Sequence, residues 1–198
     1  MDDDAFDRAL IAAAFEAVAQ QGWSRFSVAG AARQAGLPLD RARLRFPTRH
    51  AVLLRFGRLA DQAALAGAAT EGAARDRLFD TVMRRIDVLQ THRAGISALL
   101  RALPFDPPTA LLLALATRRS MGWLLEAAGI PGRLLQQKAL LAVWLYTVRA
   151  WDRDESGDLS ATMAALDRAL DRVGRIAGWT DTEPGLPPGA PDIEPLPD

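Results

Sequence analysis

The 198-residue sequence contains no cysteine, two histidines and a single lysine, and these scarcities exclude several classes of chemistry. Without cysteine there is no disulfide framework, no thiolate metal site and no thiol nucleophile. The two histidines, His50 and His92, are isolated, and a favourable contact with a helix end is a sufficient explanation for His92. We therefore expect no metal and no cofactor.

Long apolar runs are also missing, because no stretch reaches the roughly 18 residues that a membrane span needs. The chain starts with "MDDDAFDRAL", which is acidic and unlike a secretory or mitochondrial leader. Basic and acidic side chains balance at 24 each, so the overall charge neither favours nor opposes nucleic acid as a partner. We expect a cytoplasmic protein whose contact with the inner membrane, if any, is peripheral and transient.

Catalytic signatures are absent as well. There is no Gly-rich phosphate loop, no "GxSxG" and no "HExxH". The densest acidic group, "WDRDESGD" at 151–158, contains no histidine and is explained by a loop with capping carboxylates. We expect that the protein has no catalytic residues and is not an enzyme.

Helical periodicity is what the sequence does contain. Ala, Leu and Arg recur with helical spacing up to Trp179, and no alternating run persists. This pattern predicts an all-α fold in which Ser27 and Thr48 cap helices, while Gly22 and Gly36 end them. The expected helices cover about 4–21, 28–35, 38–45, 48–67, 74–90, 93–103, 109–128 and 131–152, with a last one from Asp158 or Ser160 to 178.

The composition changes abruptly after Trp179. The segment "TDTEPGLPPGAPDIEPLPD" holds six of the 12 prolines, five acids and no cation, so it cannot bury enough apolar surface to become ordered. We divide the chain into a helix-turn-helix-like N-terminal part (1–67), a ligand-binding helical bundle (68–179) and a disordered, Pro-rich acidic tail (180–198).

The N-terminal part has the spacing of a helix-turn-helix. In "FSVAGAARQAGLPLDRARLRFPTRHAVLL", small residues line one face of a helix, Gly36 allows a tight turn, and Pro47 stops the helix that follows. The pattern resembles the N-terminal domain of TetR-type regulators over about residues 9–54. The resemblance implies a TetR-like fold with the helix at 38–45 in the place of a recognition helix.

This predicted recognition helix departs from the family pattern. Asp40 stands where the family usually has a glycine, and a carboxylate at that point should repel phosphate. Arg41, Arg43, Arg45 and Arg49 nevertheless form a cationic cluster, which could be a solvated face, a site for anionic lipid or a partner, or a contact to DNA phosphates. Because the helix has no Asn, Gln or Ser to read bases, DNA is not the expected partner.

The second half of the chain carries another resemblance. The stretches "ISALLRALPFDPPTALLLALATRRSMGWLLEAAGI" and "KALLAVWLYTVRAWDRDESGDLSATMAALDRAL" contain a Leu-Pro corner, a long helix with a Trp near its end and two further helices. Their order resembles the ubiquinone-biosynthesis lipid-binding family often called Coq nine. The resemblance implies a TetR-like homodimer that binds isoprenoid or quinone lipid and assists the demethoxyubiquinone hydroxylase.

The long helices of this half are apolar on more than one face, which fits either a packed core or the wall of a cavity. On the helix at 131–152, Leu140, Trp144, Val148 and Trp151 share one face, and a second face is also apolar. A cavity could shelter part of a polyprenyl tail, since each buried CH₂ is worth ~0.8 kcal/mol. The predicted lipid-binding residues are Phe79, Met83, Ile86, Leu112, Leu115, Trp144 and Val148.

A second predicted surface involves the Leu-Pro corner. The family resemblance assigns Leu99, Leu103, Pro104 and Trp123 to the patch that meets the hydroxylase, and Trp and Leu anchors are typical of interface hot spots. From the residues alone, Trp123 could instead be half-buried where two helices cross. Relatives with strong membrane attachment carry an extra amphipathic helix at the C-terminus. Here the acidic tail leaves membrane contact to Phe105, the arginine cluster or the partner.

Together these patterns predict a non-enzymatic lipid-binding accessory protein of ubiquinone biosynthesis. It would bind isoprenoid or quinone intermediates and present them to a demethoxyubiquinone hydroxylase. The alternative is a TetR-type transcriptional repressor that binds an apolar inducer. A repressor should carry a basic stripe on the exposed face of its third helix, whereas a lipid carrier needs an unfilled apolar cavity.

Overall fold

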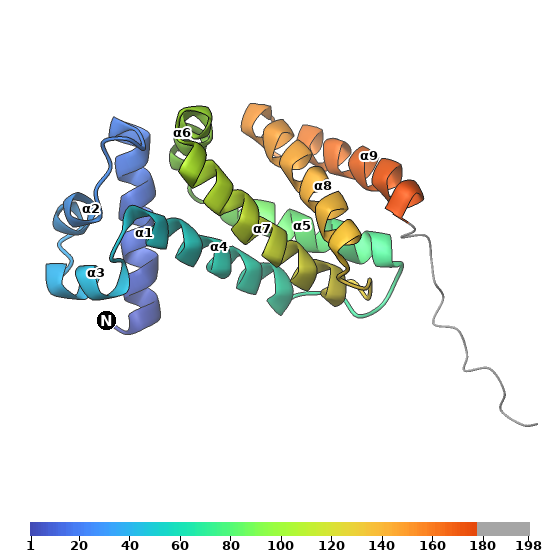
Figure 1. Ribbon diagram of the computed structural model, residues 1–198, viewed down its shortest axis with the longest axis horizontal. Helices are drawn as coiled ribbons and strands as arrows, with labels where there is room; N and C mark the ends of the chain where they lie inside the picture. Colours follow the sequence, from blue (N-terminus) through green and yellow to red (C-terminus); the bar gives the residue numbers. More distant parts are fainter. Residues whose placement is uncertain (178–198) are drawn as a thin grey trace, which may run out of the picture.

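The computed structural model describes residues 1–177, which form helices joined by short turns (Figure 1). The predicted all-α fold is confirmed over this range, and the predicted disordered tail at 180–198 lies outside the described residues. The elements are α1 (Asp3–Gln21), α2 (Val28–Gln34), α3 (Leu39–Arg45), α4 (Arg49–Ala66), α5 (Ala74–Gln90), α6 (Arg93–Ala102), the 3-10 helix η1 (Leu103–Phe105), α7 (Pro107–Ala127), α8 (Leu134–Arg153) and α9 (Ser160–Ala177).

The first helices begin and end where local chemistry requires. The side chains of Ser27 and Thr48 each accept a hydrogen bond from the backbone N–H three residues further on, so both predicted caps are confirmed. Gly22 and Gly36, which follow α1 and α2, have φ values of 81° and 64°. Glycine adopts this left-handed region without a steric cost, which explains why both helices stop there.

Two later helices begin away from their predicted positions. α7 starts at Pro107 rather than Thr109, because the Asp106 carboxylate accepts hydrogen bonds from the Thr109 backbone N–H (3.2 Å) and hydroxyl (2.8 Å). Pro107 suits the first turn, where a missing N–H leaves no hydrogen bond unmade. α8 starts at Leu134 rather than near residue 131, because Arg133 still has an extended backbone.

The helices form two parts that share α4. α1, α2 and α3 make up the N-terminal part, and α4 runs from it into the second part, where it packs against α5 and α7 (Figure 1). α7 also packs against α8, and α8 and α9 pair at the end of the molecule farthest from α3. The second part is therefore a bundle of α4 to α9 behind a helix-turn-helix.

α1 and α6 join the two parts at very close range. A side-chain carbon added at Gly95 would lie 2.2 Å from the carbonyl oxygen of Phe15, which is shorter than any real contact. Glycine is therefore required where α6 crosses α1. Phe15 is buried at this crossing, and its ring lies 4.8 Å from that of Phe56 on α4.

α6, η1 and α7 form the Leu-Pro corner that the sequence predicts. Phe105 is 89% exposed there, so the corner presents its ring to solvent as predicted. No single helix within residues 1–177 has the length and hydropathy to cross a membrane. The stretch from α6 through η1 and α7 meets both criteria only as a pair of helices, which is bent by 117° at the corner.

Candidate ligand-binding cavity and helix-turn-helix surface

An apolar cavity of about 300 Å³, partly open to solvent, lies between α1, α4, α5, α6, η1, α7 and α8. Its volume is at the lower end of the range for small-molecule sites, and its wall is dominated by aliphatic and aromatic side chains. The space behind the helix-turn-helix is therefore not filled by side-chain packing. The wall consists of Phe15, Leu53, Phe56, Gly57, Ala60, Arg85, Leu89, Ile96, Leu99, Leu100, Leu103, Ala110, Leu113, Ala114, Thr117, Trp144, Leu145 and Val148.

Two of the seven predicted lipid-binding residues, Trp144 and Val148, line this cavity. The three predicted on α5 do not: Ile86 is completely buried in the packed core, and Phe79 and Met83 pack on the side of that core. α5 turns a different face toward the cavity than the sequence pattern indicated.

The predicted residues of α7 are displaced in the same way. Leu112 is half-buried away from the cavity and Leu115 is exposed. The inward positions are Ala110, Leu113, Ala114 and Thr117, which follow the three-and-four spacing of one helix face. Leucines surround α7 on nearly all sides, so its apolar pattern did not reveal which face points inward.

The cavity wall contains a buried charge that the sequence analysis missed. Arg85 on α5 is 4% exposed, and its guanidinium lies 4.5 Å from the ring centre of Trp144. Its Nη2 atom is 3.2 Å from Oδ1 of Asp61 on α4, whose other oxygen accepts a hydrogen bond of 2.5 Å from the Ser120 hydroxyl. Burial lowers the pKa of Arg85, and the charge of Asp61 opposes this shift. Arginine nevertheless remains protonated in proteins.

A sequence signal for Arg85 did exist. Leu78, Val82, Arg85 and Leu89 recur at spacings of four, three and four, which puts the arginine within the apolar stripe of α5. A cation in such a stripe is rarely buried without a function or a partner. Arg85 is a single cation within the stripe, so it does not stand out as a cluster of charges does.

A second cavity of about 330 Å³ adjoins the first between α4 and α7. It is more polar, and Arg85 belongs to the walls of both cavities. The shared wall residues are Leu53, Gly57, Arg85, Leu113 and Thr117. The remaining walls are Leu54, Arg58, Asp61, Ala116, Arg119, Ser120 and Trp123.

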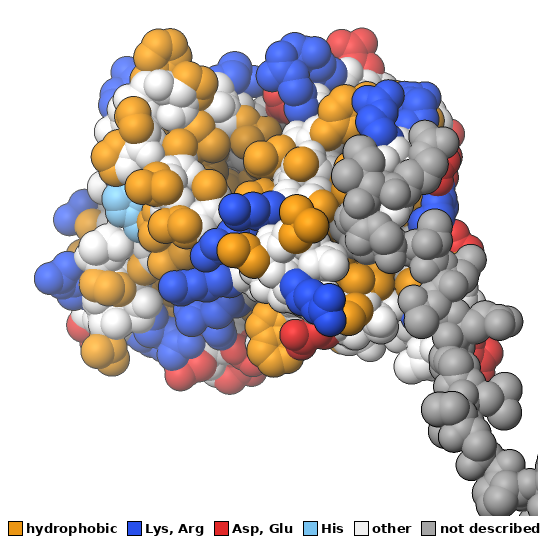
Figure 2. Space-filling model, turned by 45° about the vertical axis from the view of Figure 1, so that its right-hand side comes forward, with side chains coloured by type: hydrophobic (Ala, Val, Ile, Leu, Met, Phe, Trp, Pro, Cys, Tyr) orange, Lys and Arg blue, Asp and Glu red, His pale blue; other side chains and the backbone are white. Residues whose placement is uncertain are grey.

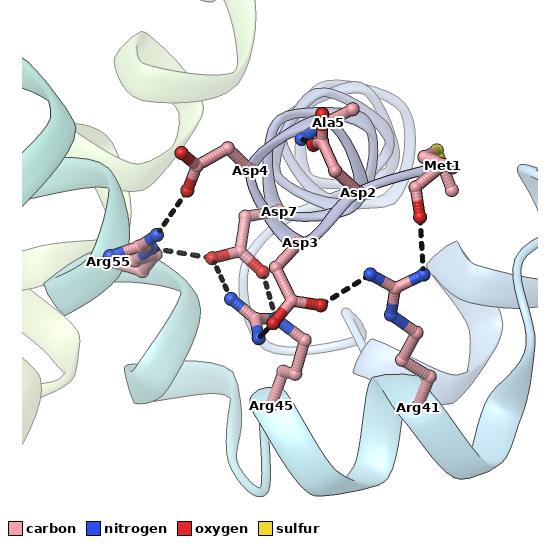
Figure 3. Close-up of polar contacts among 9 residues, drawn as sticks. All are labelled: Met1, Asp2, Asp3, Asp4, Ala5, Asp7, Arg41, Arg45 and Arg55. Atoms are coloured by element: carbon pink, nitrogen blue, oxygen red, sulfur yellow. Dashed lines mark hydrogen bonds and ion pairs between the residues drawn. The ribbon is translucent and has the colours of Figure 1, made fainter.

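Two of the four arginines of the predicted cluster, Arg41 and Arg45, are paired with acids of α1 (Figure 3). Arg45 contacts Asp7 (Nε to Oδ1, 2.5 Å) and Asp3 (Nη1 to Oδ2, 2.6 Å), and Arg41 contacts Asp3 (Nη2 to Oδ1, 2.5 Å). Arg55 of α4 reaches the second Asp7 oxygen at 2.6 Å. Burial alone would raise the pKa of Asp7, but hydrogen bonds from Arg45 and Arg55 hold it below its usual value.

The other two members of the cluster have different surroundings. Arg49 lies 4.8 Å from the ring centre of Trp23, with Nη2 3.3 Å from Asp106. Arg43 is exposed and donates a hydrogen bond to the carbonyl of Pro47. The cluster is thus not a continuous stripe of free cations. Arg43 shares the outer face of α3 with other exposed side chains, among them Asp40 and Leu44.

The four predicted partner-binding residues lie in two places. Leu99 is buried in the cavity wall, and half-buried Leu103 also lines the cavity beside exposed Pro104. Trp123 is 66% exposed, which rules out the interpretation that it is half-buried in a helix crossing. From Pro107 to Trp123 the chain rises by ~24 Å along α7, so the corner and Trp123 are not neighbours.

Trp123 belongs to an exposed stripe on α7 with Leu111, Leu115 and Arg119, which recur every four residues. Figure 2 shows one face of the molecule, on which hydrophobic side chains gather with arginines among them, while acidic side chains lie mainly toward its edges. A mixed apolar and basic surface of this kind is compatible with a protein partner or with lipid head groups.

These features define the class to which the fold belongs. The chain is a helix-turn-helix joined through one long helix to a helical bundle, and comparison with solved structures confirms the predicted TetR-like fold. No protein-family model matches the sequence, and no curated protein matches it.

Three similar structures come from two sources. A TetR transcriptional regulator from Nitrosomonas europaea ATCC 19718 has a TM-score of 0.72 at 24% identity, over 87% of this chain and 99% of that one. A TetR transcriptional regulator from Rhodococcus sp. RHA1 has a TM-score of 0.57 at 18% identity, over 87% and 97%. A further transcriptional regulator from Rhodococcus sp. Rha1 gives 0.53 at 19%, over 85% and 96%. At these identities the likeness establishes the fold.

Proposed function

We propose that this chain is a non-enzymatic binding protein for an apolar molecule, which it holds in the cavity behind the helix-turn-helix. The observation that carries the proposal is the unfilled cavity of about 300 Å³, with Trp144 and Val148 in its wall. The burial of an apolar molecule there would be driven mainly by the removal of its surface from water. A TetR-like fold is compatible with such a ligand, whichever surface responds to it.

For the ligand we propose an isoprenoid or quinone intermediate of ubiquinone biosynthesis, presented to a demethoxyubiquinone hydroxylase. The support is the sequence resemblance of the Leu-Pro corner and the helices that follow it. The cavity, at about 300 Å³, is at the lower end of the size range of small-molecule sites, which is small for a long polyprenyl tail. The protein would therefore hold the head end and the first prenyl units, while the rest of a long tail stays in the membrane.

A TetR-type repressor with an apolar inducer is the second candidate, and the fold comparison favours it. All three similar structures are described as transcriptional regulators, and each is matched over nearly its whole length. The pairing of Arg41 and Arg45 with acids of α1 weighs against it, because phosphate contacts need free cations. Both candidates imply a homodimer, and Leu145 and Tyr146 offer exposed apolar surface on α8.

Lipid extraction and native mass spectrometry test the shared proposal. The purified protein should carry a prenylated or similarly apolar molecule, while Gly57→Leu should not, because the new side chain would extend into both cavities. Gly57→Ala is the matched control, since its Cβ meets no atom within 4 Å and leaves most of the space free. If the wild type and Gly57→Leu bind apolar molecules equally, the cavity is not the site.

A gel-shift titration at low salt separates the two candidates. A repressor should bind its operator with an affinity that falls steeply as salt rises, whereas a lipid carrier should show no such binding. A mixture with demethoxyubiquinone hydroxylase is the complementary assay. There, Trp123→Lys should abolish complex formation with little change in melting temperature, because Trp123 is exposed. Operator binding by the wild-type protein, together with no complex between it and the hydroxylase, would decide for the repressor.

A further inference from the structure

We propose that the ligand of this cavity is an amphipathic anion, whose negatively charged oxygens bind Arg85 while its apolar chain occupies the space beside Trp144. This inference rests on the proposed function, because it assumes that the cavity is a binding site. It adds the chemical class of the head group and the residue that selects it.

The first argument is the incomplete pairing of a buried guanidinium. Arginine carries five N–H donors in a planar fork. Asp61 is the charged partner of Arg85, at 3.2 Å from Nη2, while Nε and Nη1 are buried and have no hydrogen-bond partner among the described residues. Buried donors are nearly always paired, so two unmet donors in a cavity wall indicate where an acceptor from a ligand would sit.

The second argument is the sign of the local charge. Arg58, Arg85 and Arg119 line the second cavity, and Asp61 is the one carboxylate that its described wall contains. The Ser120 hydroxyl donates to Asp61 Oδ2, while Oδ1 has only the ion-pair contact with Arg85 and no hydrogen bond among the described residues. The second cavity therefore has a surplus of positive charge, in which Arg85 is buried while Arg58 and Arg119 are exposed and screened by solvent. An anion is favoured there over a neutral acceptor.

The third argument is the contrast between the two ends of the site. Within the described wall of the first cavity, Arg85 is the one charged residue, and the rest is apolar apart from the Thr117 hydroxyl. The guanidinium is held in place by its stacking on Trp144. An apolar chain of medium length is a suitable probe for this space when its head group is at Arg85. The head could be a carboxylate or a phosphate ester, since both present several anionic oxygens to an arginine.

The test uses three ten-carbon probes on the full-length protein: decanoate, decyl phosphate and 1-decanol, each titrated by isothermal calorimetry. Decanoate or decyl phosphate should bind at least tenfold more tightly than decanol, and the stronger of the two identifies the head-group class. In the double variant Asp61→Asn/Arg85→Met, which leaves no unpaired carboxylate behind, that preference should vanish while decanol still binds. Arg101→Met, on the exposed surface of α6, should behave as wild type.

The outcomes separate this inference from the proposed function. If decanol binds the wild-type protein as tightly as the two anions, the head-group assignment is overturned and the apolar-ligand proposal stands. The same holds if the anion preference survives in the double variant. If none of the three probes binds, the proposed function is overturned together with this inference. The comparison of probes on the wild type does not depend on whether the variant folds.

Discussion

Arginine is used in opposite ways by the helix-turn-helix surface and by the cavity behind it. On the helix-turn-helix, Arg41, Arg45 and Arg55 all meet carboxylates of α1 at 2.6 Å or less. In the cavity wall, Arg85 is far more buried, yet two of its nitrogen atoms have no partner among the described residues. The surface that looked functional from its composition is internally satisfied, and the buried single cation is not.

The difference shows that the number of cations in a segment does not locate a binding site. Arg45 already donates to carboxylates from all three of its nitrogen atoms, so it has few N–H groups left for a phosphate. A buried guanidinium with unmet donors gains hydrogen bonds when a ligand arrives. Substitutions of the acids of α1, and substitutions at the crossing of α1 and α6, should therefore change the stability of the protein by very different amounts.

The largest effect is expected when arginines of the helix-turn-helix surface lose their carboxylate partner and become as incompletely paired as Arg85 in the cavity wall. Asp7 is 2% exposed and holds both Arg45 and Arg55. Asp7→Ala would leave two neighbouring guanidinium groups without their shared carboxylate, so the free energy of unfolding should fall by about 3 kcal/mol. Urea denaturation measures this, and Asp3→Ala is the control because Asp3 is well exposed and should cost much less.

The same pairs predict an acid dependence. The pKa of Asp7 is held below its usual value of 3.8, so the unfolded chain binds more protons than the folded one as the pH falls. Stability from these pairs is complete above that value and is lost as the pH drops through the folded pKa. If Asp7→Ala destabilises the protein no more than Asp3→Ala does, the ion pairs of Asp7 with Arg45 and Arg55 do not stabilise the N-terminal part.

The second largest effect is expected at the crossing of α1 and α6, which joins the N-terminal part to the bundle. In Gly95→Ala the new carbon would clash with the Phe15 carbonyl, so α6 and α1 would have to separate, at about 2 kcal/mol. Gly57→Ala, on a helix with open space at the Cβ, should instead gain up to ~1 kcal/mol. Thermal unfolding of both variants measures how closely α6 packs against α1. Equal melting temperatures would contradict the close contact between Gly95 and the Phe15 carbonyl.

A smaller effect on stability, confined to a narrow pH range, is expected from His92, which lies beside the crossing of α1 and α6. Its ring lies 5.2 Å from that of Phe15 and 5.7 Å from that of Phe56, and burial lowers its pKa below the usual 6.5. The unfolded chain therefore binds the extra proton first as the pH falls below 6.5, and stability declines there. His92→Phe keeps the aromatic contacts and should flatten the stability profile between pH 5 and 6.5. Parallel profiles would show that His92 does not titrate in this range.

The smallest effect is expected at Arg43, the member of the arginine cluster that has no carboxylate partner within the described residues. Arg43→Ala should change the free energy of unfolding by less than about 0.5 kcal/mol, as for most surface substitutions. Its value lies in the comparison, because a phosphate-binding α3 would depend on this free cation. If the wild type binds DNA in a salt-sensitive way and Arg43→Ala does not, the helix-turn-helix surface is a DNA-binding site.

The sequence predicted the helices well, because their ends are set by local chemistry. Ser27 and Thr48 act as caps through atoms three residues away, and Gly22 and Gly36 end helices through their own φ values. Pairings across the fold were out of reach. Arg45 and Asp7 are 38 residues apart, so no spacing rule could reveal that the acidic start of the chain neutralises the cluster.

The candidate site was predicted in part for a related reason. Trp144 and Val148 belong to an apolar face that could be identified on α8, whereas the leucines of α7 are spread around the helix. The choice of Leu112 and Leu115 over Leu113 was therefore not decided by periodicity. Arg85 could have been found from the apolar stripe of α5, since a buried cation is a stronger indication of function than an exposed group of them.

α4 has a consequence for how the two regions communicate. This helix carries Arg55, which forms an ion pair with Asp7 of α1. It also carries Gly57 and Asp61, which border the cavities. Because a helix is stiff over two residues, a ligand that displaced α4 at Gly57 would also move Arg55 relative to the Asp7 carboxylate. A molecule bound in the bundle would in that case alter the ion pairs at the start of the chain without touching them.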